Sequence, residues 1–174
     1  MHASSSPRPA SAGRILAIDY GRRRIGLALS DAAWLTAQPL ATLERTNRRN
    51  DLGRLREVVR GHDVELIVVG HPLHLDGSTG PMAVETERFA ARIEKELGVP
   101  VELVDERLSS WEAEQLLPPS RAAREREGAV DRLAAAVILR DYLGRGQSRR
   151  QTPLNAERVQ GGAPRHVSRH RRSG

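Results

Sequence analysis

Residues 15–30, ILAIDYGRRRIGLALS, decide the fold of this 174-residue chain. Residues 15–20 form an apolar strand that ends in Asp-Tyr-Gly, and residues 25–30 have the pattern of a returning strand. Gly21 permits a tight turn between them, and the arginines at 22–24 form its polar crest. The segment therefore predicts a β-hairpin with one carboxylate, that of Asp19, at the end of its first strand.

Three further strands are expected after the hairpin, at residues 37–44, 65–70 and 101–105. Pro39 marks the first of these as an edge strand, because proline cannot donate a hydrogen bond to a sheet. Residues 65–70 (ELIVVG) are nearly all apolar, which is typical of a strand covered on both faces.

Helical patterns fill the rest of this region, at residues 51–61, 81–97, 109–118 and 130–144. Asn50 is expected to cap the first helix, and Pro81 suits the first turn of the second. We expect a polar linker at 118–128 and the end of the last helix at Gly144 and Gly146.

The resulting order is β-β-β-α-β-α-β-α-α. Three antiparallel strands come first, and the later βαβ units require parallel strands joined by right-handed crossovers. The sequence therefore predicts an α/β fold with a mixed five-stranded sheet flanked by helices. One domain over residues 14–144 accounts for the whole pattern.

Composition limits the chemistry. The chain has no cysteine, which excludes disulfides, zinc-thiolate sites and thiol nucleophiles and suits a reducing cytoplasm. No apolar run approaches the ~20 residues of a membrane span, so no membrane contact is expected. Residues 1–13 lack the apolar core of a secretory signal and are expected to be a disordered leader.

The net charge of +6 is unevenly distributed. Residues 145–174 hold eight arginines and one glutamate, whereas residues 1–144 sum to −1. This Arg-rich segment has almost no apolar periodicity and is expected to be a disordered tail. It could bind polyanions through counterion release, or it could simply keep the protein in solution.

Carboxylates at three places in the sequence are candidates for an active site. Asp19 ends the first strand, Asp131 begins the last predicted helix, and the pair Asp105-Glu106 follows the last strand. Sites in open α/β sheets form beyond the carboxyl ends of strands. Converging carboxylates repel one another, and a divalent cation would relieve that conflict. Oxygen ligands alone predict Mg²⁺ or Mn²⁺, which can drive phosphodiester hydrolysis by a two-metal mechanism.

Each carboxylate also has an ordinary structural interpretation. Asp19 could bond the backbone of its own turn, Asp131 could favour a helix N-terminus, and Glu106 could pair with Arg107 at the surface. Asp105 and Glu106 point to opposite faces if both are extended, and spacing alone does not choose between them.

Four segments resemble the motifs of a bacterial family, the Holliday-junction-resolvase-like proteins, also described as pre-16S rRNA nucleases. They occur in the family's order and are residues 19–26, 70–77, 105–110 and 130–139. The resemblance implies a ribonuclease-H-like fold and the acidic trio Asp19, Glu106 and Asp131. It selects Glu106 over Asp105.

The chain departs from the family pattern in the loop after the fourth strand, where His71 and His74 replace leucine and asparagine. A His-x-x-His pair invites a zinc hypothesis, but no third ligand is near in the sequence. His74 could instead meet a phosphate or be a plain loop histidine. Arg22, Arg23 and Arg107 are the other candidate phosphate contacts, because arginine matches phosphate geometry bidentately.

The leading hypothesis is thus a cytoplasmic, Mg²⁺- or Mn²⁺-dependent endonuclease that acts on structured nucleic acid. The resemblance points to processing of the 5′ end of pre-16S ribosomal RNA. The alternatives are a resolvase of four-way DNA junctions, for which a dimer is favoured, and a non-catalytic binder of ribosomal RNA. We expect a monomer or a weak homodimer. An actin-like phosphotransferase would need a much longer chain.

Overall fold

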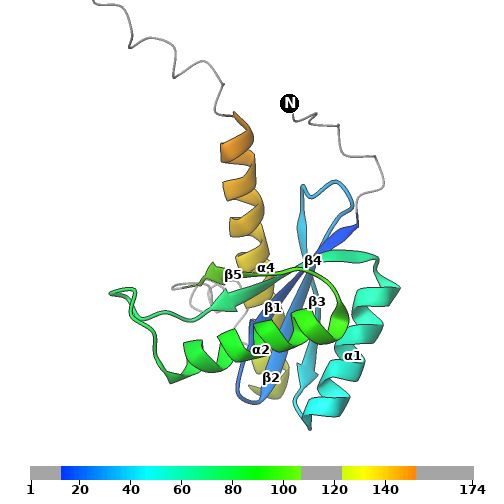
Figure 1. Ribbon diagram of the computed structural model, residues 1–174, viewed down its shortest axis with the longest axis vertical. Helices are drawn as coiled ribbons and strands as arrows, with labels where there is room; N and C mark the ends of the chain where they lie inside the picture. The colour runs from blue at the N-terminus through cyan, green and yellow to red at the C-terminus, as the bar shows by residue number, and fades with distance from the viewer. Residues whose placement is uncertain (1–12, 107–122, 152–174) are drawn as a thin grey trace, which may run out of the picture.

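A computed structural model describes residues 13–106 and 123–151 of the chain. Its centre is a five-stranded sheet with the order β3-β2-β1-β4-β5 (Figure 1). The strands are β1 Arg14–Tyr20, β2 Arg24–Ser30, β3 Ala37–Glu44, β4 Val64–His71 and β5 Val101–Asp105.

The sheet is mixed, as the sequence predicted. β1 and β2 pair antiparallel, as do β2 and β3, whereas β4 pairs parallel with both β1 and β5. β3 is an edge strand, and Pro39 lies beside a shift in its register with β2. The predicted hairpin, the edge position and the parallel strands are therefore confirmed.

Helices cover the two faces of the sheet separately. The helices α1 Arg48–Gly61 and α2 Pro81–Leu97 pack on one face, and α4 Ala123–Gln151 packs on the other (Figure 1). β4 contributes to both cores: Ile67 faces α1 and α2, whereas Val68 faces α4. Burial on both sides explains why this strand is continuously apolar.

The ends of α1 and α2 show how local residues set helix boundaries. The cap of α1 is Asn47, whose side chain accepts a hydrogen bond from the Asn50 N–H at 3.0 Å. The expected cap at Asn50 was therefore wrong by three residues. α2 begins at Pro81 and ends at Leu97, so the predicted range is confirmed. Its C-cap, Gly98, has a φ of 69° in the left-handed region.

The last helix is longer than predicted. α4 begins at Ala123, inside the expected linker, and continues through Gly144 and Gly146 to Gln151. Residues 145–151 are thus helical, and the predicted end of the helix was wrong. Glycine costs a helix only about 1 kcal/mol, and packing against the sheet supports the early turns, where the Thr42 hydroxyl donates to the Gly128 carbonyl.

Residues 1–12 of the predicted leader at 1–13, the predicted helix at 109–118 and the part of the predicted tail beyond 151 lie outside the described residues. Within the described ranges, no helix has the length and apolar character needed to cross a membrane.

Candidate functional site

The carboxyl end of β1 carries Asp19 on the face that α4 covers. Ile15 and Ala17, four and two residues earlier, belong to the core beneath α4, so strand alternation directs Asp19 to the same side. Asp19 is paired with Gly26 of β2 across the antiparallel ladder. A Cβ on Gly26 would lie 2.0 Å from the carbonyl oxygen of Asp131. The missing side chain of Gly26 therefore lets α4 bring Asp131 close to the sheet beside Asp19.

Glu106 reaches the same face from β5. Val104 lies in the core beneath α4, and Glu106 follows it by two residues. A Cβ on Gly70 of β4 would lie 1.7 Å from Oε2 of Glu106, so the carboxylate packs directly over this glycine. Alternation sends Asp105 to the opposite side of the sheet. The three predicted carboxylates thus lie on one face at one end of the sheet, and Asp105 does not join them.

Arg24 is a further residue of this region. Its Nε lies 2.7 Å from Oδ2 of Asp131, and its Nη1 lies 2.9 Å from Oε2 of Glu127, one turn earlier on α4. Sequence reasoning grouped Arg24 with the polar crest of the hairpin and missed this role. Alternation could have found it, because Arg24 stands two residues before Gly26 and therefore on the α4 face.

The surroundings of Asp19 and Glu106 disfavour the ionised form of both carboxyl groups. Burial, followed by the charge of Asp131, raises the pKa of Asp19 from 3.8 to about 7. Burial, followed by the charges of Asp19 and Asp105, raises the pKa of Glu106 from 4.5 to about 8. Such shifts are typical of functional carboxylates, because ordinary surface acids keep their charge near neutral pH.

His71, at the end of β4, and His74, in the loop that follows, contact different partners. The Nε2 atom of His71 lies 2.9 Å from Oε1 of Glu87 on α2. The ring of His74 packs against Gly80, where a Cβ would lie 2.6 Å from its Nε2. The two histidines therefore have separate partners and do not form a shared metal site. Within residues 13–106 and 123–151, no group of three or more His, Cys, Asp or Glu side chains, the three carboxylates on the α4 face included, has the arrangement of a preformed metal site.

The remaining predicted contacts lie near the hairpin crest or outside the described residues. Arg22 and Arg23 are both exposed at the turn between β1 and β2. Arg107 lies outside the described residues.

The sheet order and the carboxylates at its edge define a protein of the ribonuclease-H-like class. The family model described as "RuvX: Holliday junction resolvase" matches residues 13–145, and the chain belongs to this family. It is a nuclease, that is, a phosphodiester hydrolase acting on nucleic acid.

Two curated relatives are each named "Putative pre-16S rRNA nuclease". The protein from Syntrophus aciditrophicus is 51% identical over 75% of this chain and 87% of its own length. The protein from Koribacter versatilis is 46% identical over 83% of this chain and 95% of its own length. Among solved structures, T. thermophilus RuvC in complex with a Holliday junction substrate has a TM-score of 0.46 at 17% identity, covering 77% of this chain and 96% of RuvC.

Proposed function

We propose that this nuclease is a divalent-metal-dependent endonuclease that processes the 5′ end of pre-16S ribosomal RNA, with Asp19, Glu106 and Asp131 as its catalytic carboxylates. The observation that carries the proposal is the convergence of these three side chains on the α4 face, where Gly26 makes room for the Asp131 backbone and Gly70 for the Glu106 carboxylate. The names of the curated relatives support ribosomal RNA as the substrate.

The donor atoms fit Mg²⁺ or Mn²⁺. All three candidate ligands are hard carboxylate oxygens, which these ions prefer. The raised pKa values of Asp19 and Glu106 mean that their ionised forms are costly in the protein alone, and a bound cation would offset that cost. When bound, such ions activate water and stabilise the leaving oxygen of a phosphodiester.

The protein's own side chains would prepare this site. Asp131 is held by Arg24 at 2.7 Å, which fixes its carboxylate at the edge of the cluster and partly neutralises it. The packing of Glu106 over Gly70 fixes the second carboxylate beside the core. Secondary contacts to phosphates would come from Arg22, Arg23, His74 and Arg107. Processing of the ribosomal RNA would take place in the cytoplasm.

The test is cleavage of a precursor 16S RNA fragment by purified full-length protein with Mn²⁺ or Mg²⁺. Asp19→Asn should lower the rate at least about 100-fold and weaken Mn²⁺ binding measured by calorimetry. Asp63→Asn is the matched control, because Asp63 is an exposed aspartate with φ of 52°, a conformation that asparagine tolerates. Equal cleavage by the wild type and Asp19→Asn would refute the proposed site.

A second substrate is favoured by the description of the matching family model as a Holliday junction resolvase. Resolution of a four-way DNA junction requires two symmetric cuts, and a dimer provides them. The same protein preparations should therefore be assayed on a synthetic junction, with the solution mass measured in parallel. Junction cleavage by a dimer, without cleavage of the precursor RNA, would replace the ribosomal assignment.

A further inference from the structure

A second candidate site lies on the opposite face of the sheet from the carboxylates. A cavity of about 230 Å³ opens between the end of β1, the connection from β3 to α1, and the side of α2. Four arginines line it, together with one carboxylate, that of Asp51. We call it the arginine cavity and define it by these arginines, which are Arg22, Arg45, Arg48 and Arg92.

An aromatic pair beneath Arg45 forms the floor of the arginine cavity. The rings of Tyr20 and Phe89 stack with centroids 4.0 Å apart, and the guanidinium carbon of Arg45 lies 4.5 Å from the Tyr20 centroid on its ring face. Both aromatic residues are less than a tenth exposed. Because their faces are covered, these rings cannot stack on a nucleic-acid base, and the lining offers charge instead.

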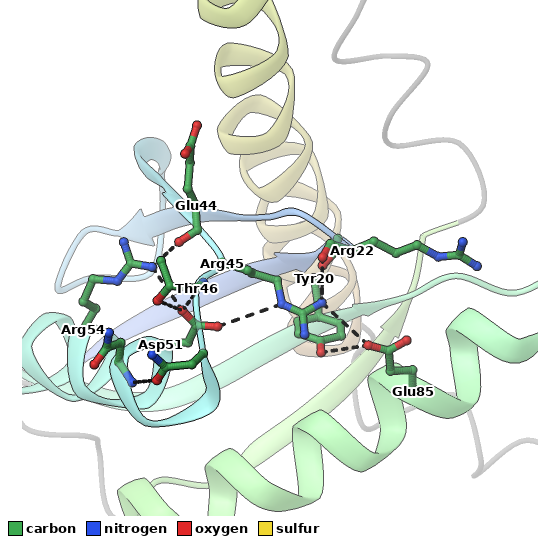
Figure 2. Close-up of polar contacts among 11 residues, drawn as sticks. Tyr20, Arg22, Glu44, Arg45, Thr46, Asp51, Arg54 and Glu85 are labelled. Atoms are coloured by element: carbon green, nitrogen blue, oxygen red, sulfur yellow. Dashed lines mark hydrogen bonds and ion pairs between the residues drawn. The ribbon is translucent and has the colours of Figure 1, made fainter.

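Arg45 and Asp51 build the cavity wall and are already engaged (Figure 2). Arg45 donates from Nη1 to the carbonyls of Gly21 and Arg22 at 2.9 and 3.1 Å, and the same atom lies 3.6 Å from Glu85. Asp51 accepts from the Thr46 N–H and from Arg54, both at 3.1 Å. The one carboxylate of the lining is thus satisfied by its own neighbours.

Two of the lining arginines, Arg22 and Arg92, have charged side chains available to a ligand. Arg48 has only a long contact with Glu96, at 3.9 Å. The side chains of Arg22 and Arg92 have no hydrogen bond or ion pair with any residue in the described ranges. Figure 2 shows the side chain of Arg22 extending away from Arg45 and Tyr20. A ligand with negative charge would supply the partners that the protein does not.

We propose that the arginine cavity binds a backbone phosphate of the nucleic-acid strand. This phosphate would lie beside the phosphate that the acidic site acts on. Arginine pairs bidentately with phosphate oxygens. The cavity is smaller than the ~300–1,000 Å³ of pockets that enclose whole small ligands. Its volume therefore suits a phosphate and part of its sugar better than a free nucleotide.

The position of the cavity relative to the carboxylates supports a strand that reaches both. Asp19 and Tyr20 are consecutive residues at the carboxyl end of β1, and alternation sends them to opposite faces. A nucleic-acid strand that crosses this edge of the sheet would pass from the acidic site to the arginines. This inference rests on the proposed function for the identity of the ligand, but the cavity shares only Arg22 with the residues of that proposal.

The chain offers a local probe, because Phe89 is its only phenylalanine. Full-length protein labelled with 4-fluorophenylalanine, in an Asp19→Asn background that does not cleave, would give one fluorine resonance at the cavity floor. Titration with a single-stranded RNA dodecamer should shift this resonance. RNA bound only by the Arg-rich tail would leave it unchanged.

The decisive variant is Arg22→Gln with Arg92→Gln. It should abolish the shift, weaken RNA binding measured by fluorescence anisotropy about 10-fold, and lower the slope of log affinity against log salt by about 0.7, the contribution of one single-strand phosphate contact. The matched control, Arg60→Gln with Lys95→Gln, removes two exposed charges outside the cavity and should change affinity less than about 3-fold.

Four outcomes would overturn the proposal: no fluorine shift with RNA, an equal loss of affinity in both double variants, an equal shift with polyglutamate, or binding of 5′-AMP as tight as that of RNA. The last would mean that the cavity takes free nucleotides. If the fluorine resonance shifts but the wild-type protein cleaves no RNA, the cavity proposal stands and the nuclease site is refuted. The two failures are therefore distinguishable.

Discussion

The two faces of the sheet differ most where β1 ends. On the α4 face, Asp19 meets other carboxylates and its pKa rises to about 7. On the other face, Tyr20 lies under Arg45 in a cavity lined by arginines. One peptide bond separates an acidic environment from a basic one, because successive strand residues point in opposite directions. A polyanion and its cations could therefore be held at one edge by the two faces, each contributing the opposite charge.

The largest expected effect tests which face carries the chemistry. Glu106→Gln should lower cleavage about 100- to 1,000-fold, because it removes a charged oxygen ligand on the α4 face. Asp105→Asn, at the adjacent position on the opposite face, should change the rate less than about 3-fold. Single-turnover assays with saturating Mn²⁺ measure both. Comparable losses in the two variants would contradict the assignment by alternation.

The next effect concerns how the α4 face is assembled. Gly26→Ala should lower the free energy of unfolding by about 2–4 kcal/mol, since the added Cβ would lie 2.0 Å from the Asp131 carbonyl and α4 must move away. Gly53→Ala in α1 is the matched control, with no atom within 4 Å of the added Cβ. It should stabilise by about 0.5–1 kcal/mol. Urea unfolding measures both, and equal values would argue against close packing at Gly26.

The features that sequence could predict are those written in local patterns. The hairpin at 15–30 and the helix at 81–97 carry their own turn, proline and glycine signals. The length of α4 was missed because contacts with β2 and β3, such as Thr42 with Gly128, sustain a helix over a stretch that reads as polar linker.

The residues of the candidate site were likewise predictable only in part. Asp19 and Asp131 stand out in the sequence, but the choice between Asp105 and Glu106 depends on knowing which face α4 covers. Arg24 acquires its partner only when α4 crosses β2. The arginine cavity was not foreseen at all, because its lining residues come from three separate stretches of chain with no shared motif.

The smallest effect is a pH dependence that belongs to the acidic face alone. The pKa of Asp19 is 3.8 in its ordinary state and about 7 in the fold, and that of Glu106 rises from 4.5 to about 8. Below about pH 4 both groups are protonated whether the chain is folded or not, so they contribute nothing. As pH rises from about 4 to 8, the unfolded chain ionises first, and the free energy of unfolding falls.

Measured in EDTA, the loss between pH 5 and pH 6 should be on the order of 1–3 kcal/mol, because two groups each contribute about 1.4 kcal/mol per pH unit in this range. Asp19→Asn should reduce this loss and be more stable than the wild type at pH 8, since it removes a buried charge that the metal-free protein must accommodate. Mg²⁺ at pH 8 should raise the stability of the wild type more than that of the variant, because the ion binds the folded carboxylates. The Arg22→Gln/Arg92→Gln variant, altered only on the other face, should retain the full pH dependence. Parallel pH profiles of the wild type and Asp19→Asn would show instead that burial and the charge of Asp131 do not raise the pKa of Asp19.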